Sequence, residues 1–359
     1  MTAPLVISQF WADEATDAHD AINQLKSRIL ALDNLPKNVT LVSAGEVCIL
    51  LDGAVTGFYL WLSERTHVTF ISAACTSLHA GILDFYHSDL DSTLVISLEL
   101  DKHFQQGCLN ALGIGNDIDQ DGLDVVPGVG FIAMHKGNEQ PRKGDLVIEH
   151  CQLLSQGPGL TGTSSLVRQL YHELKDLPEH VLPVSFDICS QWGKSLWKGL
   201  DMRLEASQQV PDWLSSIERC QRHYLSLKPL FELQMYQQKL QNNSLLLLTL
   251  GGGGRVGMLQ LGKSEQLGKN STIGTNLPQA SFETHCMSTD INGYELALAL
   301  RQEDPSAYYQ QIRTTLKYPR SRYRGMDNHY FKWQPAHDSH PTIAKSTSTR
   351  TTRKTRSGV

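Results

Sequence analysis

The chain has 359 residues, of which 40% are hydrophobic, 8% aromatic and 19% charged. This composition supports a sizeable buried core, and the length allows one large domain or two ordinary ones. The formal net charge of −5 at pH 7 argues against a protein that coats DNA or an anionic membrane. No secretory signal or membrane-length apolar run is visible, so we expect a cytoplasmic protein.

Strands and helices are predicted to alternate through the first hundred residues. Because strands that alternate with helices form parallel sheets covered on both faces, this order predicts an α/β fold. The β-branched runs predict strands and the 3.6-residue apolar periodicity predicts helices. The predicted strands are residues 4–10, 39–44, 67–72 and 93–99, and the predicted helices are residues 13–32, 54–62 and 76–86.

Two later segments resemble each other. Residues 129–134 (VGFIAM) and 256–261 (VGMLQL) each read as a strand entered through glycine. The match is consistent with a duplicated half, and the alternative is that a glycine followed by a strand recurs by chance.

The seven cysteines are scattered and form no CxxC pair. This spacing argues against a disulfide framework and against a zinc knuckle, so we predict no metal site. Cys75 differs from the others, since it lies between the predicted strand 67–72 and the predicted helix 76–86. The amino terminus of a helix favours a thiolate and offers backbone N–H groups to an oxyanion, so Cys75 is a candidate nucleophile. The alternative is a buried cysteine packed where a strand meets a helix.

The segment AACTSLHA around Cys75 resembles the active-site cysteine motif of the thiolase superfamily, in particular of its ketoacyl synthases. Residues 93–99, 116–136 and 244–261 resemble further segments of that superfamily in the same order. The glycine run at 251–254 could instead cradle a phosphate, but it lacks the GK[ST] ending of a P-loop and the GxGxxG spacing of a dinucleotide site.

The resemblance implies a duplicated five-layered α-β-α-β-α fold. We place the first half at residues 1–150, a shortened second half at 151–263, an extension at 264–339 and a disordered basic tail at 340–359. The resemblance further implies acyl-carrier-protein or coenzyme A thioesters as substrates, with no tightly bound cofactor. It also implies a homodimer, or a heterodimer with a ketosynthase homologue.

The second half departs from the family pattern. Where synthase III enzymes carry a histidine, residues 182–192 (LPVSFDICSQW) have none, and Cys189, Ser190 and Gln191 occupy the neighbourhood. His223 takes the place of the family's asparagine if a helix begins near Pro229, and we predict a catalytic role for it. The alternative for His223 is a surface histidine.

Three other histidines are weaker catalytic candidates. We expect His79 to be a packed neighbour of Cys75, on the same helix face. We expect His172 and His180 to be solvated residues at helix ends.

The extension combines basic and aromatic residues. Arg320, Arg322 and Arg324 are the cations we propose as contacts for phosphopantetheine or a carrier protein, with single-stranded nucleic acid as an alternative ligand. An ordinary surface element that packs its aromatic residues on the main domain is the other interpretation.

Two functions follow from these observations. The first is a ketosynthase-type acyltransferase that uses Cys75 in fatty acid or polyketide biosynthesis. The second is a non-catalytic partner subunit of the chain-length-factor type, which the missing histidine favours.

Overall fold

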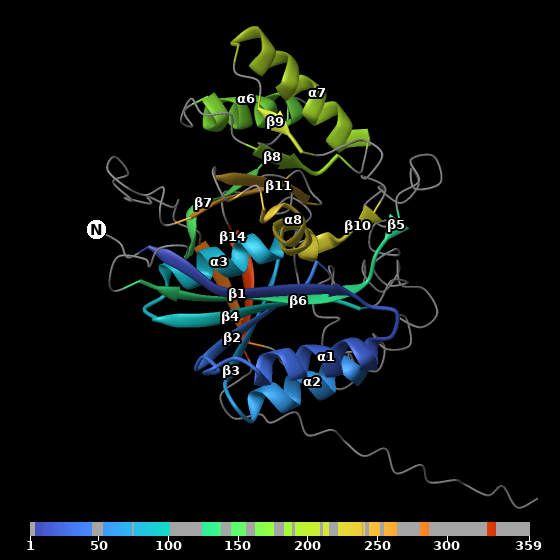
Figure 1. Ribbon diagram of the computed structural model, residues 1–359, viewed down its shortest axis with the longest axis vertical. Helices are drawn as coiled ribbons and strands as arrows, with labels where there is room; N and C mark the ends of the chain where they lie inside the picture. Colours follow the sequence, from blue (N-terminus) through green and yellow to red (C-terminus); the bar gives the residue numbers. More distant parts are fainter. Residues whose placement is uncertain are drawn as a thin grey trace, which may run out of the picture.

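A computed structural model of the chain shows a mixed α/β protein (Figure 1). The structure describes residues 4–44, 53–73, 75–100, 124–137, 145–155, 162–175, 183–188, 191–208, 211–214, 222–238, 240, 244–251, 255–263, 281–286 and 329–334.

The elements of the first half follow the predicted alternation. The predicted strand 67–72 has those same bounds in the structure, whereas β1 extends to Glu14 instead of Phe10. Helix α1 begins at Ala18, after an N-cap in which the Asp17 carboxylate accepts from the backbone N–H of Asp20 at 2.9 Å. The elements are β1 (Leu5–Glu14), α1 (Ala18–Leu30), β2 (Asn38–Val42), α2 (Gly53–Ser63), β3 (His67–Ser72), α3 (Ser77–His87), β4 (Ser92–Glu99), β5 (Asp124–Val125) and β6 (Gly128–Lys136).

The second half repeats this plan. Its elements are β7 (Leu146–Ser155), α6 (Gly162–Lys175), β8 (Pro183–Phe186), α7 (Gln191–Ala206), β9 (Asp212–Trp213), β10 (Arg222–His223), the 3-10 helix η4 (Leu225–Leu227), α8 (Lys228–Tyr236), β11 (Leu245–Gly251) and β12 (Arg255–Lys263). The predicted boundary at residue 150 lies inside β7, so the strand order places the start of the second half at Leu146.

The strand order shows the duplication directly. The first half runs β3-β2-β4-β6-β1 and the second runs β9-β8-β11-β12-β7 when read from its own edge. Within both halves the first three strands in this order are parallel and the fourth is antiparallel to the third. The central strands β1 and β7 join the halves as an antiparallel pair. Strands β6 and β12, whose sequences resemble each other, occupy equivalent positions.

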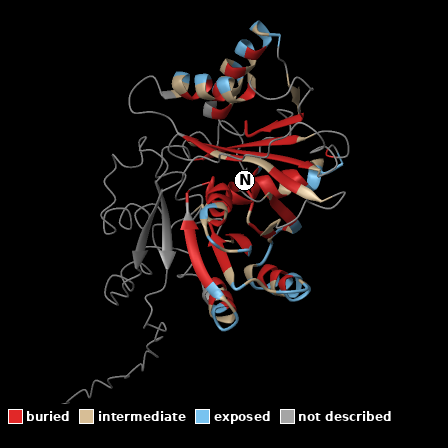
Figure 2. Ribbon diagram, turned by 90° about the vertical axis from the view of Figure 1, so that its left-hand side faces the viewer, coloured by how far each residue is buried: buried red, intermediate tan, exposed pale blue. Residues whose placement is uncertain are grey.

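Three hydrophobic cores define five layers. Helices α1 and α2 pack on the outer face of the first half, and α6 and α7 pack on the outer face of the second half. The central core contains α3 and α8 together with strand residues from both halves. Figure 1 shows α3 and α8 between the two outer helix pairs, and Figure 2 shows the strands buried and the outer faces of the helices exposed. The predicted five-layered α-β-α-β-α arrangement is therefore confirmed.

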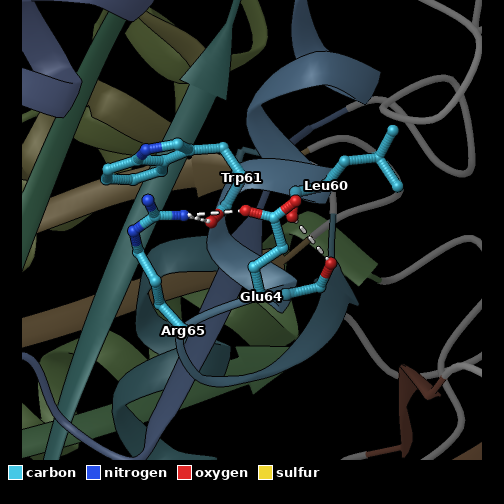
Figure 3. A network of polar contacts seen from close by, with 5 residues as sticks. Leu60, Trp61, Glu64 and Arg65 are labelled. Atoms are coloured by element: carbon cyan, nitrogen blue, oxygen red, sulfur yellow. Dashed lines mark hydrogen bonds and ion pairs between the residues drawn. The ribbon is translucent and has the colours of Figure 1, made fainter.

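The end of α2 anchors the start of β3, the strand that leads to Cys75. Arg65 donates to the backbone oxygen of Trp61 at 2.6 Å and contacts Glu64 at 3.1 Å (Figure 3). A cation at this position complements the carboxyl end of the helix dipole. The hydroxyl of Thr66 then donates to the backbone oxygen of Pro36 at 2.7 Å, which fixes the entry into β3 beside β2.

Two strands of the predicted extension join the sheet of the first half. Strand β14 (His329–Gln334) is antiparallel to β3, with Phe331 opposite Ser72, and β13 (Ser281–Cys286) is parallel to β14. The segment 264–339 therefore contributes the edge of the first-half sheet. None of the described helices is long and apolar enough to cross a membrane.

Candidate active site

Cys75 lies in a tight turn between β3 and α3. The hydroxyl of Thr76 donates to the backbone oxygen of Ala73 at 2.6 Å, and the backbone N–H of Ala73 donates to the hydroxyl of Ser77 at 2.7 Å. These small polar residues close the turn, and the helix that follows directs its amino-terminal dipole toward it. Cys75 is 5% exposed, so its thiol is almost fully enclosed.

His223 lies on a short strand of the second half. Strand β10 pairs in parallel with β5, and the backbone oxygen of His223 accepts from Val126 N–H at 3.1 Å. Leu225 follows with a φ of 52°, a left-handed conformation that is costly for a leucine and turns the chain into η4 and α8. The predicted helix near Pro229 is therefore present as α8.

The two side chains meet in the central layer. The distance from Cys75 Sγ to His223 Nε2 is 3.4 Å, and His223 is 6% exposed. Cys75 lies just before α3 of the first half, and His223 lies on β10, before η4 and α8 of the second half, so each half contributes one member of the pair. The nucleophile and the histidine predicted from the sequence are thus brought together, while their catalytic roles remain predictions.

Burial controls the protonation of His223. It lowers the pKa of the imidazole below its usual 6.5, and Lys228 lowers it further, whereas the nearby Asp187 raises it. A neutral imidazole at pH 7 can accept the proton of a thiol. The resulting imidazolium then stabilises the thiolate.

A buried group of charged residues lies beside His223. Lys228 Nζ is 3.0 Å from Glu232 Oε1, and the hydroxyl of Ser185 donates to the same oxygen at 2.6 Å. Asp187 follows directly after β8 and has no exposed surface. It lies within the segment 182–192, in which the sequence analysis looked for a histidine.

The place of Asp187 near His223 was not predicted from the sequence. Of the residues that the sequence analysis named in this segment, Gln191 begins α7, and Cys189 and Ser190 lie outside the described residues. The sequence did contain a signal for Asp187, since a carboxylate directly follows the strand segment VSF. A charge at the end of a buried strand requires a partner or a function.

The other histidine predictions have mixed outcomes. His79 is fully buried, and its ring lies so close to Gly257 that a Cβ placed there would be 2.6 Å from two ring atoms. The prediction that His79 is a packed residue is confirmed. His172 is exposed in α6, as predicted, and His180 lies outside the described residues.

The predicted cofactor contacts cannot be placed. Arg320, Arg322 and Arg324 lie outside the described residues. Among the residues that the structure describes, no group of three or more His, Cys, Asp or Glu side chains is arranged to hold a metal ion.

Comparisons with known proteins give structural matches only. No family model and no curated protein matches the sequence. The fold is similar to cerulenin-bound OleA from Xanthomonas campestris, with a TM-score of 0.48 at 10% identity over 73% of this chain and 99% of that chain. It is also similar to the 3-oxoacyl-(acyl carrier protein) synthase III FabH from Pseudomonas aeruginosa PAO1, with a TM-score of 0.43 at 13% identity over 72% of this chain and 98% of that chain.

Proposed function

We propose that this protein is a ketosynthase-like acyltransferase that forms a carbon–carbon bond between acyl thioesters through a cysteine acyl-enzyme. The observation that carries the proposal is the 3.4 Å contact between Cys75 Sγ of the first half and His223 Nε2 of the second half. A thiol beside a neutral imidazole at a helix amino terminus has the composition of an activated cysteine nucleophile.

The first half-reaction is acyl transfer to Cys75. His223 Nε2 accepts the thiol proton, and the thiolate attacks the thioester carbonyl. A new S–C bond forms, the bond from the carbonyl carbon to the carrier sulfur breaks, and the departing thiolate receives the proton from His223.

The second half-reaction joins two carbons. The second thioester carries an α-carboxylate, which leaves as carbon dioxide, and the electron pair of the broken C–C bond forms the carbanion. The carbanion attacks the acyl carbon, the S–C bond to Cys75 breaks, and the released thiolate takes up a proton from solvent. Before this half-reaction the imidazole exchanges its proton from Nδ1 to Nε2, and in that tautomer His223 can donate a hydrogen bond to the enolate oxygen of the second thioester. The donor thioesters would be those of acyl carrier protein or coenzyme A, in fatty acid or polyketide-type biosynthesis, with the protein acting in the cytoplasm as a dimer.

Intact-protein mass spectrometry tests this function. After incubation with a panel of acyl-coenzyme A and acyl-carrier thioesters, the protein should gain the mass of one acyl group. Cys75→Ala should abolish the gain, whereas His223→Ala should still acylate slowly but should lose condensation. Cys151→Ala is the matched control, because Cys151 is a fully buried thiol whose pKa is strongly raised by burial.

The same experiment separates the two functions considered from the sequence. If the wild-type protein is never acylated, alone or with a co-purified homologous subunit, the result would contradict the acyltransferase function and support the role of a non-catalytic partner subunit.

A further inference from the structure

A buried carboxylate, Glu99, lies between the segments that carry Cys75 and His223. It is the last residue of β4 and is 1% exposed. Strands β2, β3 and β4 are parallel, so their carboxyl ends meet at one edge of the sheet. Glu99 therefore lies at the same edge as the turn that contains Cys75.

One series of hydrogen bonds connects Glu99 to the turn that contains Cys75. The backbone N–H of Ala44 donates to Glu99 at 2.6 Å, and the hydroxyl of Ser43 donates to it at 3.3 Å. The backbone oxygen of Ser43 accepts from the hydroxyl of Ser77 at 2.8 Å, and Ser77 in turn accepts from the N–H of Ala73 at 2.7 Å. Cys75 lies between these last two residues.

A second series of hydrogen bonds connects Glu99 to the segment that follows His223. The hydroxyl of Ser226 donates to Glu99 Oε1, and it also contacts the hydroxyl of Ser97 at 2.7 Å. Ser226 is in η4, three residues after His223, and has no exposed surface. This series crosses from the first half of the fold to the second.

We infer that Glu99 is a positioning residue that sets the separation of Cys75 from His223 by hydrogen-bonding to both segments. The inference rests on the proposed function, because it assigns a task at the same site. The hydrogen bonds described above join Glu99 to Ser43, Ala44 and Ser226, which belong to the segments around the pair. Glu99 acts through the fixed geometry of its acceptors, since a network in which every member is paired holds a single arrangement.

This mechanism distinguishes position from charge. In Glu99→Gln the side-chain oxygen still accepts from Ala44 and Ser226, and the amide can donate to Ser43 Oγ. If Glu99 acts by position, Glu99→Gln should keep the wild-type separation of Cys75 from His223. Glu99→Ala and Ser226→Ala should let this separation vary. Ser226→Ala removes only the second series of hydrogen bonds and is the variant to use if Glu99→Ala does not fold.

The test is the pH profile of Cys75 alkylation by iodoacetamide, followed by peptide mapping. The ratio of the rate at about pH 7 to the rate at about pH 9.5 reports thiolate formation rather than access. We expect Glu99→Ala and Ser226→Ala to lower this ratio about fivefold or more, and Glu99→Gln to stay within about twofold of the wild type. Glu149→Ala, which removes a carboxylate that accepts from Gln260 at 2.7 Å on β7, should leave the ratio unchanged.

Each outcome decides the matter. The positioning role is overturned, while the proposed function stands, if the alanine variants fold and keep the wild-type rate ratio. The same holds if Glu99→Gln lowers the rate ratio as much as Glu99→Ala does. If wild-type Cys75 reacts no faster at neutral pH than an ordinary thiol and His223→Ala changes nothing, the Cys75–His223 pair and the inference fail together.

Discussion

His79 shows how burial restricts what a side chain near the nucleophile can do. It lies one turn after Cys75, and among the described residues neither of its ring nitrogens has a hydrogen-bond partner. Burial lowers its pKa to about 3, so the ring is neutral throughout the physiological range. In the proposed mechanism the proton transfer falls to His223, because its Nε2 lies 3.4 Å from Cys75 Sγ, and His79 takes no part in it.

The lowered pKa of His79 makes stability depend on pH. The unfolded chain binds a proton near pH 6.5 that the folded protein excludes, so stability is lost as the pH falls from 6.5 toward 3. At about pH 5 the loss from His79 amounts to about 2 kcal/mol relative to neutral pH. Urea unfolding at both pH values should show this loss, and His79→Leu should remove it.

The exposed histidine of α6 provides the control for this measurement. His172→Gln should leave the pH dependence of the unfolding free energy as it is in the wild type. His223 keeps part of the dependence in every variant, because burial lowers its pKa too. An identical pH dependence in the wild type and in His79→Leu would contradict the assignment.

At the scale of elements, α8 depends on an internal ion pair. Lys228 and Glu232 are 8% and 6% exposed and lie one turn apart on the helix. Glu232→Leu leaves the Lys228 ammonium buried without its carboxylate, so we expect the free energy of unfolding to fall by about 3–5 kcal/mol. Lys228→Met combined with Glu232→Leu should recover most of that loss, as measured by urea unfolding.

The end of α2 offers the matched surface pair. Glu64 and Arg65 are both exposed, and Glu64→Ala should lower the free energy of unfolding by less than about 1 kcal/mol. If Glu64→Ala and Glu232→Leu lower the free energy of unfolding equally, burial does not determine how much an ion pair contributes to stability.

The elements also show what the sequence could predict. The strand 67–72 and the turn at Cys75 were predictable because propensity, apolar pattern and small turn residues agree there. Strand β1 was predicted too short, because its last four residues, from Trp11 to Glu14, are extended through pairing with β6. Pairing with distant residues leaves no local pattern.

The pairing of Cys75 with His223 was predictable to a similar extent. Cys75 was marked by its place before a helix, and His223 was proposed only because the resemblance places it where the family carries an asparagine. The networks around Glu99 and Lys228 were not predictable, because each joins side chains from separate elements. Their members look like ordinary polar residues until the fold brings them together.

At the scale of the whole molecule, β14 covers the edge of β3. Removing residues 264–359 would leave β3 with an unpaired edge beside the buried side chains of Val68, Phe70 and Ile71. We expect this truncation to lower the melting temperature and to cause self-association, which light scattering and size-exclusion chromatography would detect.

A shorter truncation is the control. Removing residues 340–359 retains β13 and β14 and should leave the melting temperature nearly unchanged. If the longer truncation stays monomeric and equally stable, the strand pairing contributes little and the extension is an independent module.

The separation of Cys75 from His223 along the chain has a consequence for biosynthesis. The two residues lie 148 positions apart, and β5, β10 and α8 must all be in place before they meet. Domains emerge from the ribosome amino terminus first, so the first half carries its nucleophile through translation without the histidine. Under the proposed function, the Cys75 thiol would gain its histidine only in the completed molecule, so we expect the nascent chain to escape acylation.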